Sequence, residues 1–480
     1  MEKFSWFIVA VAGVGSACGG VKDNGQLADA PAASIDAPAT TIDAPTAPDI
    51  DAPPPTPVKV TVLTTGGDGA PDPAAKVVFQ DAAGAVIQDG AVDAAGHTQA
   101  MLPTGGTVVV IRTTTDSATL LAAQVTVMTG VKPGDDLTFG IKAPPTILTL
   151  GGATTMTATF PPDSAAGATT FYTDCGGSSG ASDPIKGVAT LTFRDSCHGA
   201  RFDLIGIASG GNLLAPQFVT LTNINYQGGA AFAIPTAFGD MPQFTVNLQN
   251  VPDKLASLQV TRASMIGNVA VAPQVSFTSA PAAGSLAVMV PFAPGFGTRS
   301  ELALGATRAD ATSFQVFDVH TDTLTASATV DAGALALPWI TDLKANPTGA
   351  TWTTVAQGGT PDGMLTQWGG SWTDATGRAV SVAWRVIQPA QASGITLPKL
   401  PVAYASVDPS QQTVVVSPRL LFVVYGDYDQ VSGYDDLRRM AESYLPLMFS
   451  VSGDVPSALG AFTGMPFKRR LSIATTFRRG

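Results

Sequence analysis

The stretch that decides the fold class is Met364–Thr373 (MLTQWGGSWT), followed by Asp374–Gly377 (DATG) and Ala379–Ile387 (AVSVAWRVI). Side chains on a strand alternate between the two faces of a sheet, so Trp368 and Trp372 share one face. Two such runs joined by an Asp/Gly turn are typical of a β-hairpin. If Trp372 pairs with Val380, the same register places Trp368 directly opposite Trp384.

The same alternation of apolar and polar residues recurs along the chain. It predicts four further strands, each with one buried face made of Met156, Ala158 and Phe160; Ala189, Leu191 and Phe193; Phe244, Val246 and Leu248; or Leu324, Ala326, Ala328 and Val330. Thr, Val, Gly and Pro are abundant and Glu is scarce, which favours strands and turns over surface helices. Gly, Pro, Asp and Asn clusters separate the runs, as in β-sandwiches.

Two segments near the C-terminus depart from this alternation. Leu420–Tyr425 is a continuous apolar run, which predicts a strand buried on both faces. Apolar residues recur at helical spacing over roughly Tyr434–Met448, which predicts a helix. We therefore expect an all-β chain of tandem Ig-like or prealbumin-like β-sandwich domains after a disordered tether, with one short helix near the C-terminus. The expected boundaries are 1–18, 19–57, 58–142, 143–222, 223–335 and 336–480.

Turn signals punctuate the first expected domain, 58–142. Asp81–Gly84 and Asp93–Gly96 each follow a strand-like run, and Val58–Leu63, Ala75–Gln80 and Thr107–Arg112 are the predicted strands. This arrangement resembles carboxypeptidase-regulatory-like, prealbumin-type β-sandwiches of secreted proteins. The resemblance implies a non-catalytic spacer or binding module.

The N-terminus indicates export. Phe4–Ala17 is an apolar run too short to span a bilayer, and small residues lead to Cys18. Ile-Asp-Ala-Pro recurs at 35–38, 42–45 and 50–53, and proline in each unit excludes a helix and favours an extended chain. Residues 1–57 thus resemble the signal peptide, lipidation cysteine and tether of Gram-negative surface lipoproteins. The resemblance implies lipidation at Cys18 and a membrane as partner; ordinary signal cleavage, with a periplasmic or secreted product, is the alternative.

The remaining cysteines and the net charge limit the chemistry further. In an exported chain Cys175 and Cys197 are expected to form a disulfide, although with His198 they also offer zinc ligands. We expect the disulfide, no metal and no cofactor. A formal net charge of −11 argues against nucleic acid as a partner, because phosphate binding needs a basic face.

Three motifs suggest chemistry and have simpler structural explanations. Gly176–Gly180 (GGSSG) matches a nucleophile elbow, but that motif needs an α/β context, and a Gly/Ser loop is the alternative. Asp427, Asp429, Asp435 and Asp436 lack the spacing of a calcium loop and instead suit a helix N-terminus. The basic residues from Lys468 to Arg479 suit either an anionic surface or a solvated final strand edge.

The tryptophans are the one specific indication of a binding site. Five of the six lie between Trp339 and Trp384. An exposed face with Trp368, Trp372 and Trp384 would stack on sugar rings, whereas the valines on the same face favour a sandwich core. We expect a non-enzymatic cell-surface lipoprotein that acts as an adhesive, structural or ligand-binding module. The alternatives are a carbohydrate-binding protein using the Trp339–Trp384 segment, an exported polymer hydrolase, and binding to another envelope protein.

Overall fold

The computed structural model describes residues 56–64, 69–140, 154–161, 168–174, 181–183, 187–193, 201–209, 213, 215–266, 269–297, 299–311, 313–321, 326–390, 393–413, 416–428, 431–439 and 469–475. Strands dominate this part of the chain, and they pack as sandwiches, which confirms the all-β prediction. Cys18 and nearly all of the expected tether lie outside the described residues.

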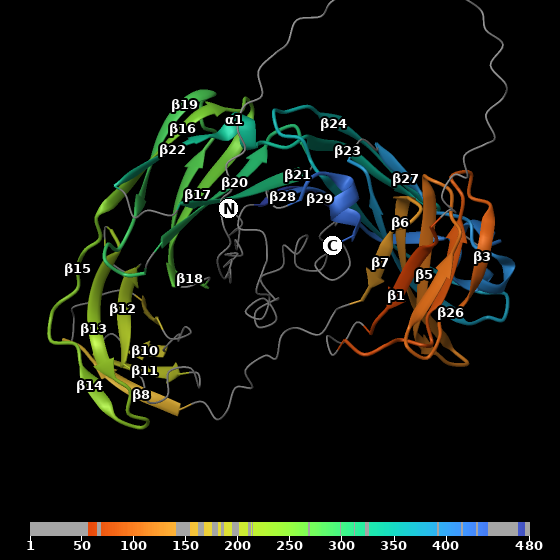
Figure 1. Cartoon of the computed structure of the whole chain (residues 1–480). Coiled ribbons are helices and arrows are strands. Elements are labelled where there is room, and N and C mark those ends of the chain that lie inside the picture. The colour runs from red at the N-terminus through yellow and green to blue at the C-terminus, as the bar shows by residue number, and fades with distance from the viewer. Residues whose placement is uncertain are drawn as a thin grey trace, which may run out of the picture.

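One sheet of twelve strands is the framework against which smaller sheets of the molecule pack (Figure 1). In spatial order its strands are β18 (Val269–Ser279), β17 (Leu255–Ile266), β20 (Arg299–Arg308), β21 (Ser313–Thr321), β29 (Arg469–Thr475), β28 (Ser417–Tyr428), β25 (Gly363–Thr373), β26 (Ala379–Gln388), β6 (Leu120–Val131), β5 (Gly106–Asp116), β2 (Lys76–Gln80) and β3 (Val86–Ala91). The predicted buried strand lies within β28, near the middle of this sheet, where both faces are covered.

Main-chain pairing crosses the domain boundaries that we expected. β26 pairs in parallel with β6, and β21 pairs with β29 in antiparallel fashion, so segment 336–480 is hydrogen-bonded to segments 58–142 and 223–335. Local sequence patterns do not predict this sharing, because strands that are far apart in the chain pair without a local turn signal. Strand β29, which carries Arg469 and Arg470, is consequently an inner strand between β21 and β28, so the interpretation of these two basic residues as a sheet edge is wrong. Lys468, Arg478 and Arg479 lie outside the described residues.

Three small sheets pack against the large one and close separate hydrophobic cores. They are β4 (His97–Ala100), β1 (Val58–Val62) and β7 (Asp136–Phe139); β23 (Trp339–Asn346), β24 (Gly349–Val355) and β27 (Gly394–Thr396); and β19 (Gly284–Pro291), β16 (Gln243–Val251) and β22 (Ser327–Asp331). The first two cover opposite faces of the β25–β26–β6–β5 region, because odd-numbered Leu365 and Ile387 join the core with β1 while even-numbered Trp368 and Trp384 join the core with β24.

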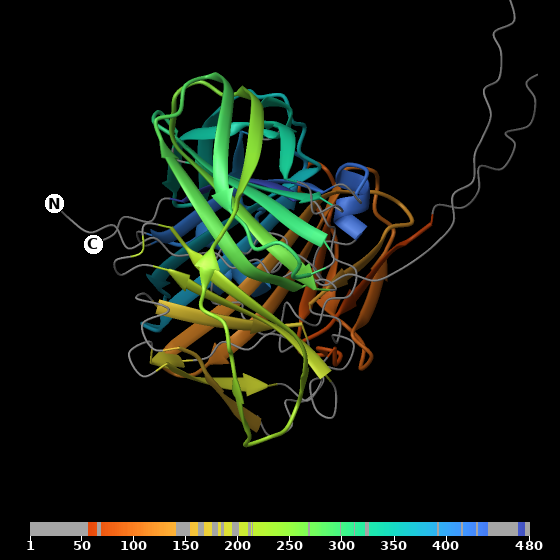
Figure 2. The ribbon, with the colours of Figure 1, turned by 90° about the vertical axis from the view of Figure 1, so that its left-hand side faces the viewer.

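A further sandwich has its own core and stacks beside the one formed by β16–β22 (Figure 2). Its two sheets are β10 (Ala181–Asp183), β11 (Val188–Phe193), β8 (Thr154–Thr159) and β14 (Ala231–Ala233), and β15 (Gly239–Asp240), β13 (Gln217–Asn225), β12 (Arg201–Ser209) and β9 (Ala168–Thr173). The alternation predicted for β8, β11 and β16 is confirmed in their burial. Of the set expected at 324–330, Val330 is buried and Ala326 is exposed.

Helices are short in the described residues. They are α1 (Ala332–Leu335), the 3-10 turns η2 (Val402–Val407) and η3 (Pro409–Gln411), and a helix at 434–439. The last one begins where the sequence predicted it; its expected continuation to Met448 lies outside the described residues. No helix in the described part of the chain is long and apolar enough to cross a membrane.

Candidate functional site

The tryptophan hairpin forms in the predicted register. Strands β25 and β26 pair Trp372 with Val380 and Trp368 with Trp384. The turn between them has Asp374 accepting main-chain N–H groups from Thr376 at 2.9 Å and Arg378 at 3.0 Å. The prediction of an Asp/Gly-turned hairpin is therefore confirmed.

The tryptophan rings are core residues rather than an exposed platform. Trp368 and Trp384 are 0 % exposed and Trp372 is 6 % exposed. Sheet β23–β24–β27 covers this face with Ile340, Ala350 and other apolar side chains. The assignment of Trp368, Trp372 and Trp384 as ligand-binding residues is wrong. The physical reason is that the valines sharing this face make it apolar throughout, so a second sheet buries it.

Polar contacts fix the tryptophan core from within. The indole of Trp368 donates to the Asn346 carbonyl at 3.0 Å, and that of Trp352 donates to the Tyr425 hydroxyl at 3.0 Å. Burial raises the pKa of the Tyr425 phenol, because the charged phenolate would lose its hydration. Tyr425 is therefore a neutral partner of an indole, and the region has the properties of a packed interior.

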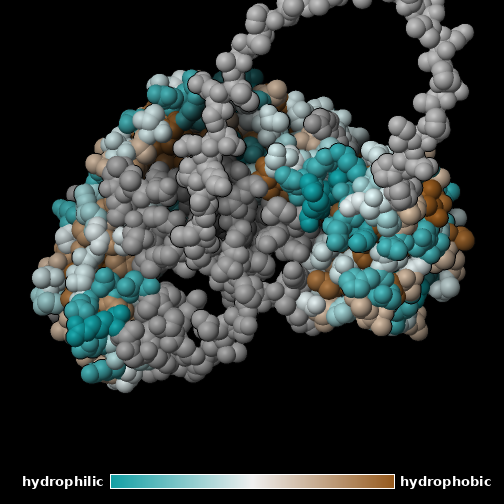
Figure 3. All heavy atoms as spheres, in the orientation of Figure 1, coloured by the Kyte–Doolittle hydropathy of each residue, from teal (hydrophilic) through white to brown (hydrophobic). Residues whose placement is uncertain are grey.

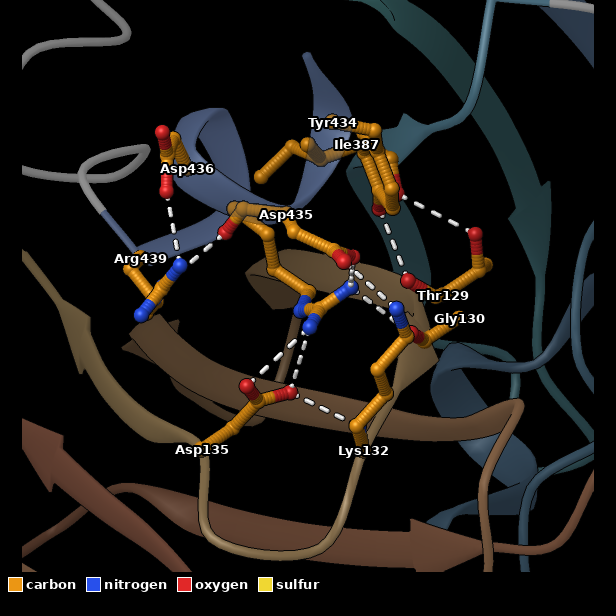
Figure 4. Close-up of polar contacts among 10 residues, drawn as sticks. Thr129, Gly130, Lys132, Asp135, Ile387, Tyr434, Asp435, Asp436 and Arg439 are labelled. Atoms are coloured by element: carbon orange, nitrogen blue, oxygen red, sulfur yellow. Dashed lines mark hydrogen bonds and ion pairs between the residues drawn. The ribbon is translucent and has the colours of Figure 1, made fainter. Parts of the chain in front are cut away.

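A second group of polar side chains forms around the helix at 434–439 (Figure 4). The Arg438 side chain is 1 % exposed, and its guanidinium contacts the Asp135 carboxylate at 2.8 and 3.0 Å. The same guanidinium donates to the Gly130 carbonyl at 2.7 Å and to Asp435 at 3.0 Å. A planar guanidinium that bonds two carboxylates and a carbonyl is held in one orientation. We call Arg438, Asp135, Asp435, Lys132 and Tyr434 the helix clamp.

The other members of the clamp attach the helix to two strands. Lys132 pairs with Asp435, and the Tyr434 hydroxyl lies 2.7 Å from the Thr129 carbonyl and 3.0 Å from the Ile387 carbonyl. Burial strongly raises the pKa of Tyr434, so it stays a neutral hydrogen-bond donor. The outer side of this region belongs to a hydrophilic patch on the surface (Figure 3). The contacts join β6, β26 and the helix, which is a structural role.

The acidic residues considered for calcium are engaged with cations of the chain itself. Asp435 binds Lys132 and Arg438, which lower the pKa of its carboxyl. Asp436 contacts Arg439 at 2.7 Å, and buried Asp427 contacts Arg470 at 2.7 Å. Asp429 lies outside the described residues. Among the described residues, no group of three or more His, Cys, Asp or Glu side chains could hold a metal ion.

Three aspartates build one and the same turn at different places in the sheet system. Asp81, Asp93 and Asp374 each accept the main-chain N–H groups two and four residues later, at 2.8–3.0 Å. The glycine three positions later has φ of +84°, +79° and +84° respectively, a conformation that glycine adopts readily. For Asp374 the Thr376 hydroxyl, then the Arg378 groups, lower the carboxyl pKa to about 2.

One carboxylate pair in the described region bears on the hydrolase alternative. Asp174 accepts the N–H of Asp203 at 2.8 Å, and Asp203 accepts the N–H of Asn223 at 2.8 Å. Burial, and then the nearby Asp203, raise the pKa of the Asp174 carboxyl, while the N–H of Asp203 lowers it. Asn223 has φ of +61° and Asp203 lies at a register shift in β12. Both carboxylates therefore serve an irregular strand pairing.

Several predicted residues lie outside the described part of the chain. These are Cys18, Cys175, Cys197, His198 and the Gly176–Gly180 loop. His97 is described, and its ring contacts the Thr61 hydroxyl at 3.1 Å. The helix clamp was missed by sequence reasoning, since Asp135 and Arg438 are separated by 303 positions and share no motif.

Comparisons with known proteins do not place this chain in a family. No family model matches it, and no curated protein matches it. A solved structure, the Bacillus anthracis TIE protein, is similar over 58 % of this chain and 50 % of its own length, with 12 % sequence identity and a TM-score of 0.13. The chain thus spans about half the length of that protein.

Proposed function

We propose that this chain is an exported, lipid-anchored protein of a Gram-negative envelope that acts without catalysis, as a structural or adhesive surface module. The N-terminal sequence supports this location, because an apolar run ends at Cys18 and an extended Asp/Pro-rich tether follows. At roughly 3.1 Å per residue such a tether reaches on the order of 120 Å, enough to hold a folded body away from a membrane.

The observation that carries the non-catalytic role is the use of the ionisable side chains. Asp81, Asp93 and Asp374 close turns, and buried Asp135 and Asp427 bind arginines that lie far away in the sequence. These contacts connect neighbouring strands within the large sheet, the large sheet to the sheet that contains β4, and the helix at 434–439 to the end of β6. Ionisable side chains that are used in this way hold the strands and the helix in a rigid scaffold, which suits a structural or adhesive surface module.

The anchor is tested by expressing the full chain and its Cys18→Ala variant in a Gram-negative host fed an alkyne fatty acid. We expect label on the unaltered chain, its recovery with outer membranes, and loss of both in Cys18→Ala. Unlabelled full chain recovered from the periplasm would contradict the proposal.

The surface role is tested on intact cells. Cells carrying the unaltered chain should lose it to added protease and should attach to one another or to a surface more strongly than cells carrying Cys18→Ala. Equal attachment of the two strains, at equal protein levels, would refute an adhesive role.

A further inference from the structure

An uncharged rim with exposed apolar side chains lies at one end of the large sheet. β18 is the terminal strand there, and β19 is the terminal strand of the small sheet that faces it. The Ser276 hydroxyl donates to the Met289 carbonyl, so the two strands lie together. Val275 and Phe277 on β18 are 41 % and 53 % exposed, and Met289 on β19 is 63 % exposed. We call these three residues and the two strands the β18–β19 rim.

The outer part of β18, from Gln274 to Ser279, lacks the features that normally keep a sheet edge monomeric, whereas its first part has Pro273 and a register shift in its pairing with β17. Edge strands are commonly protected by charged side chains, shortness or bulges. β18 extends over 11 residues, and the sequence has no charged side chain from Ala263 to Thr298. Strand β3, at the opposite end of the sheet, has only 6 residues and the charged Asp89. The two ends of the sheet therefore differ in their protection.

We propose that the β18–β19 rim is the docking surface for a second copy of this chain, related by a two-fold axis. Each copy has a net charge of −11, so two copies repel unless they meet where neither presents a charge. The rim is such a place on both partners at once. A two-fold contact uses the same patch twice, so it needs a patch that is complementary to itself.

The β18 sequence provides that self-complementarity. Val275 and Phe277 are two residues apart and share a face. When two copies of β18 run antiparallel with Ser276 on the axis, Val275 of each copy lies opposite Phe277 of the other. Apolar side chains then meet apolar side chains in both halves of the contact, with Met289 at the flank. This docking does not require the lipid anchor.

Sedimentation velocity on the full chain carrying Cys18→Ala tests the inference without adding lipid or detergent mass. We expect the chain to dimerise at about micromolar concentration. In Phe277→Lys and in Met289→Lys the dissociation constant of the dimer should be at least about tenfold larger. The matched control is Ile87→Lys, an aliphatic residue on β3 that is 47 % exposed, and it should leave the dimer unchanged.

Two results would overturn the inference. One is a monomer throughout the range up to about 100 μM. The other is a dimer that Phe277→Lys and Met289→Lys leave intact. Trp339 shares a core with Val288 and Val290 of β19, so unchanged tryptophan emission in each variant shows that the sandwich beneath the rim keeps its fold. Failure of the lipid-labelling test would leave this result untouched, so the two proposals fail separately.

Discussion

Replacing Arg438 by methionine should destabilise the protein far more than its size suggests. The side chain is 1 % exposed, and its loss leaves the Asp135 carboxylate, 9 % exposed, without the cation that compensates its burial. Breaking a buried ion pair by removing one partner costs about 3–5 kcal/mol, most of it the penalty of the charge left behind. The Gly130 carbonyl also loses its donor at 2.7 Å. We therefore expect Arg438→Met to lower the free energy of unfolding by about 4 kcal/mol.

Its neighbour supplies the control. Arg439 is 56 % exposed and pairs with Asp436 on the helix surface, so Arg439→Met should cost about 0.5 kcal/mol or less. Urea unfolding of the full chain, followed by tryptophan emission, measures both. A double variant, Asp135→Asn with Arg438→Met, removes the buried carboxylate that has lost its cation. Its loss of unfolding free energy should be smaller, by more than about 1 kcal/mol, than the sum of the losses in the two single variants. Equal costs for Arg438→Met and Arg439→Met, or strictly additive effects in the double variant, would refute the reasoning.

Three other expectations concern the turns and the tryptophan core. Gly96→Ala should destabilise more than Gly84→Ala in thermal unfolding, because both have positive φ but only at Gly96 does an added Cβ come within 2.4 Å of the Val62 carbonyl oxygen; equal shifts in melting temperature would contradict this. The Asp374 carboxyl has a folded pKa near 2 against 3.8 unfolded, so its stabilisation is present above pH 4 and is lost as the pH falls toward 2; the stability difference from Asp374→Ala should shrink over that window, and a constant difference argues against the cause. Tryptophan emission of the folded chain should be blue-shifted and resist acrylamide, and Trp384→Ala should cost about 3–5 kcal/mol; red-shifted, readily quenched emission would place the rings at the surface.

Local pattern was enough to predict the hairpin and the turns. The register of Trp368 with Trp384 follows from the period-two alternation and from the Asp374–Gly377 turn, both of which lie within a few residues of the pair. The Asp81–Gly84 and Asp93–Gly96 turns are similar cases, since carboxylate and glycine act on neighbouring main-chain groups.

Contacts between residues that are far apart in the chain could not be predicted from the sequence. The parallel pairing of β26 with β6 and the Arg438–Asp135 contact join segments far apart in the chain. An arginine beside aspartates on a helix resembles any solvated charged face until the docking of that helix buries it. The cellular location differs from both, because it is inferred only from Cys18 and the tether in the sequence. Export and lipid anchoring therefore stay predictions.

The sequence by itself determined the all-β class, the three Asp/Gly turns and which side chains share a face of β8, β11, β16, β25 and β26. It did so because alternation and turn chemistry act between residues that are close in the chain. Only the tertiary structure decided that the tryptophan face is a core, since that depends on sheet β23–β24–β27 covering it. The tertiary structure likewise decided that β29 is an inner strand and that the β18–β19 rim ends the sheet. The alternation of residues along a strand shows that the strand has an apolar face. Which segment covers that face depends on parts of the chain that lie elsewhere in the sequence.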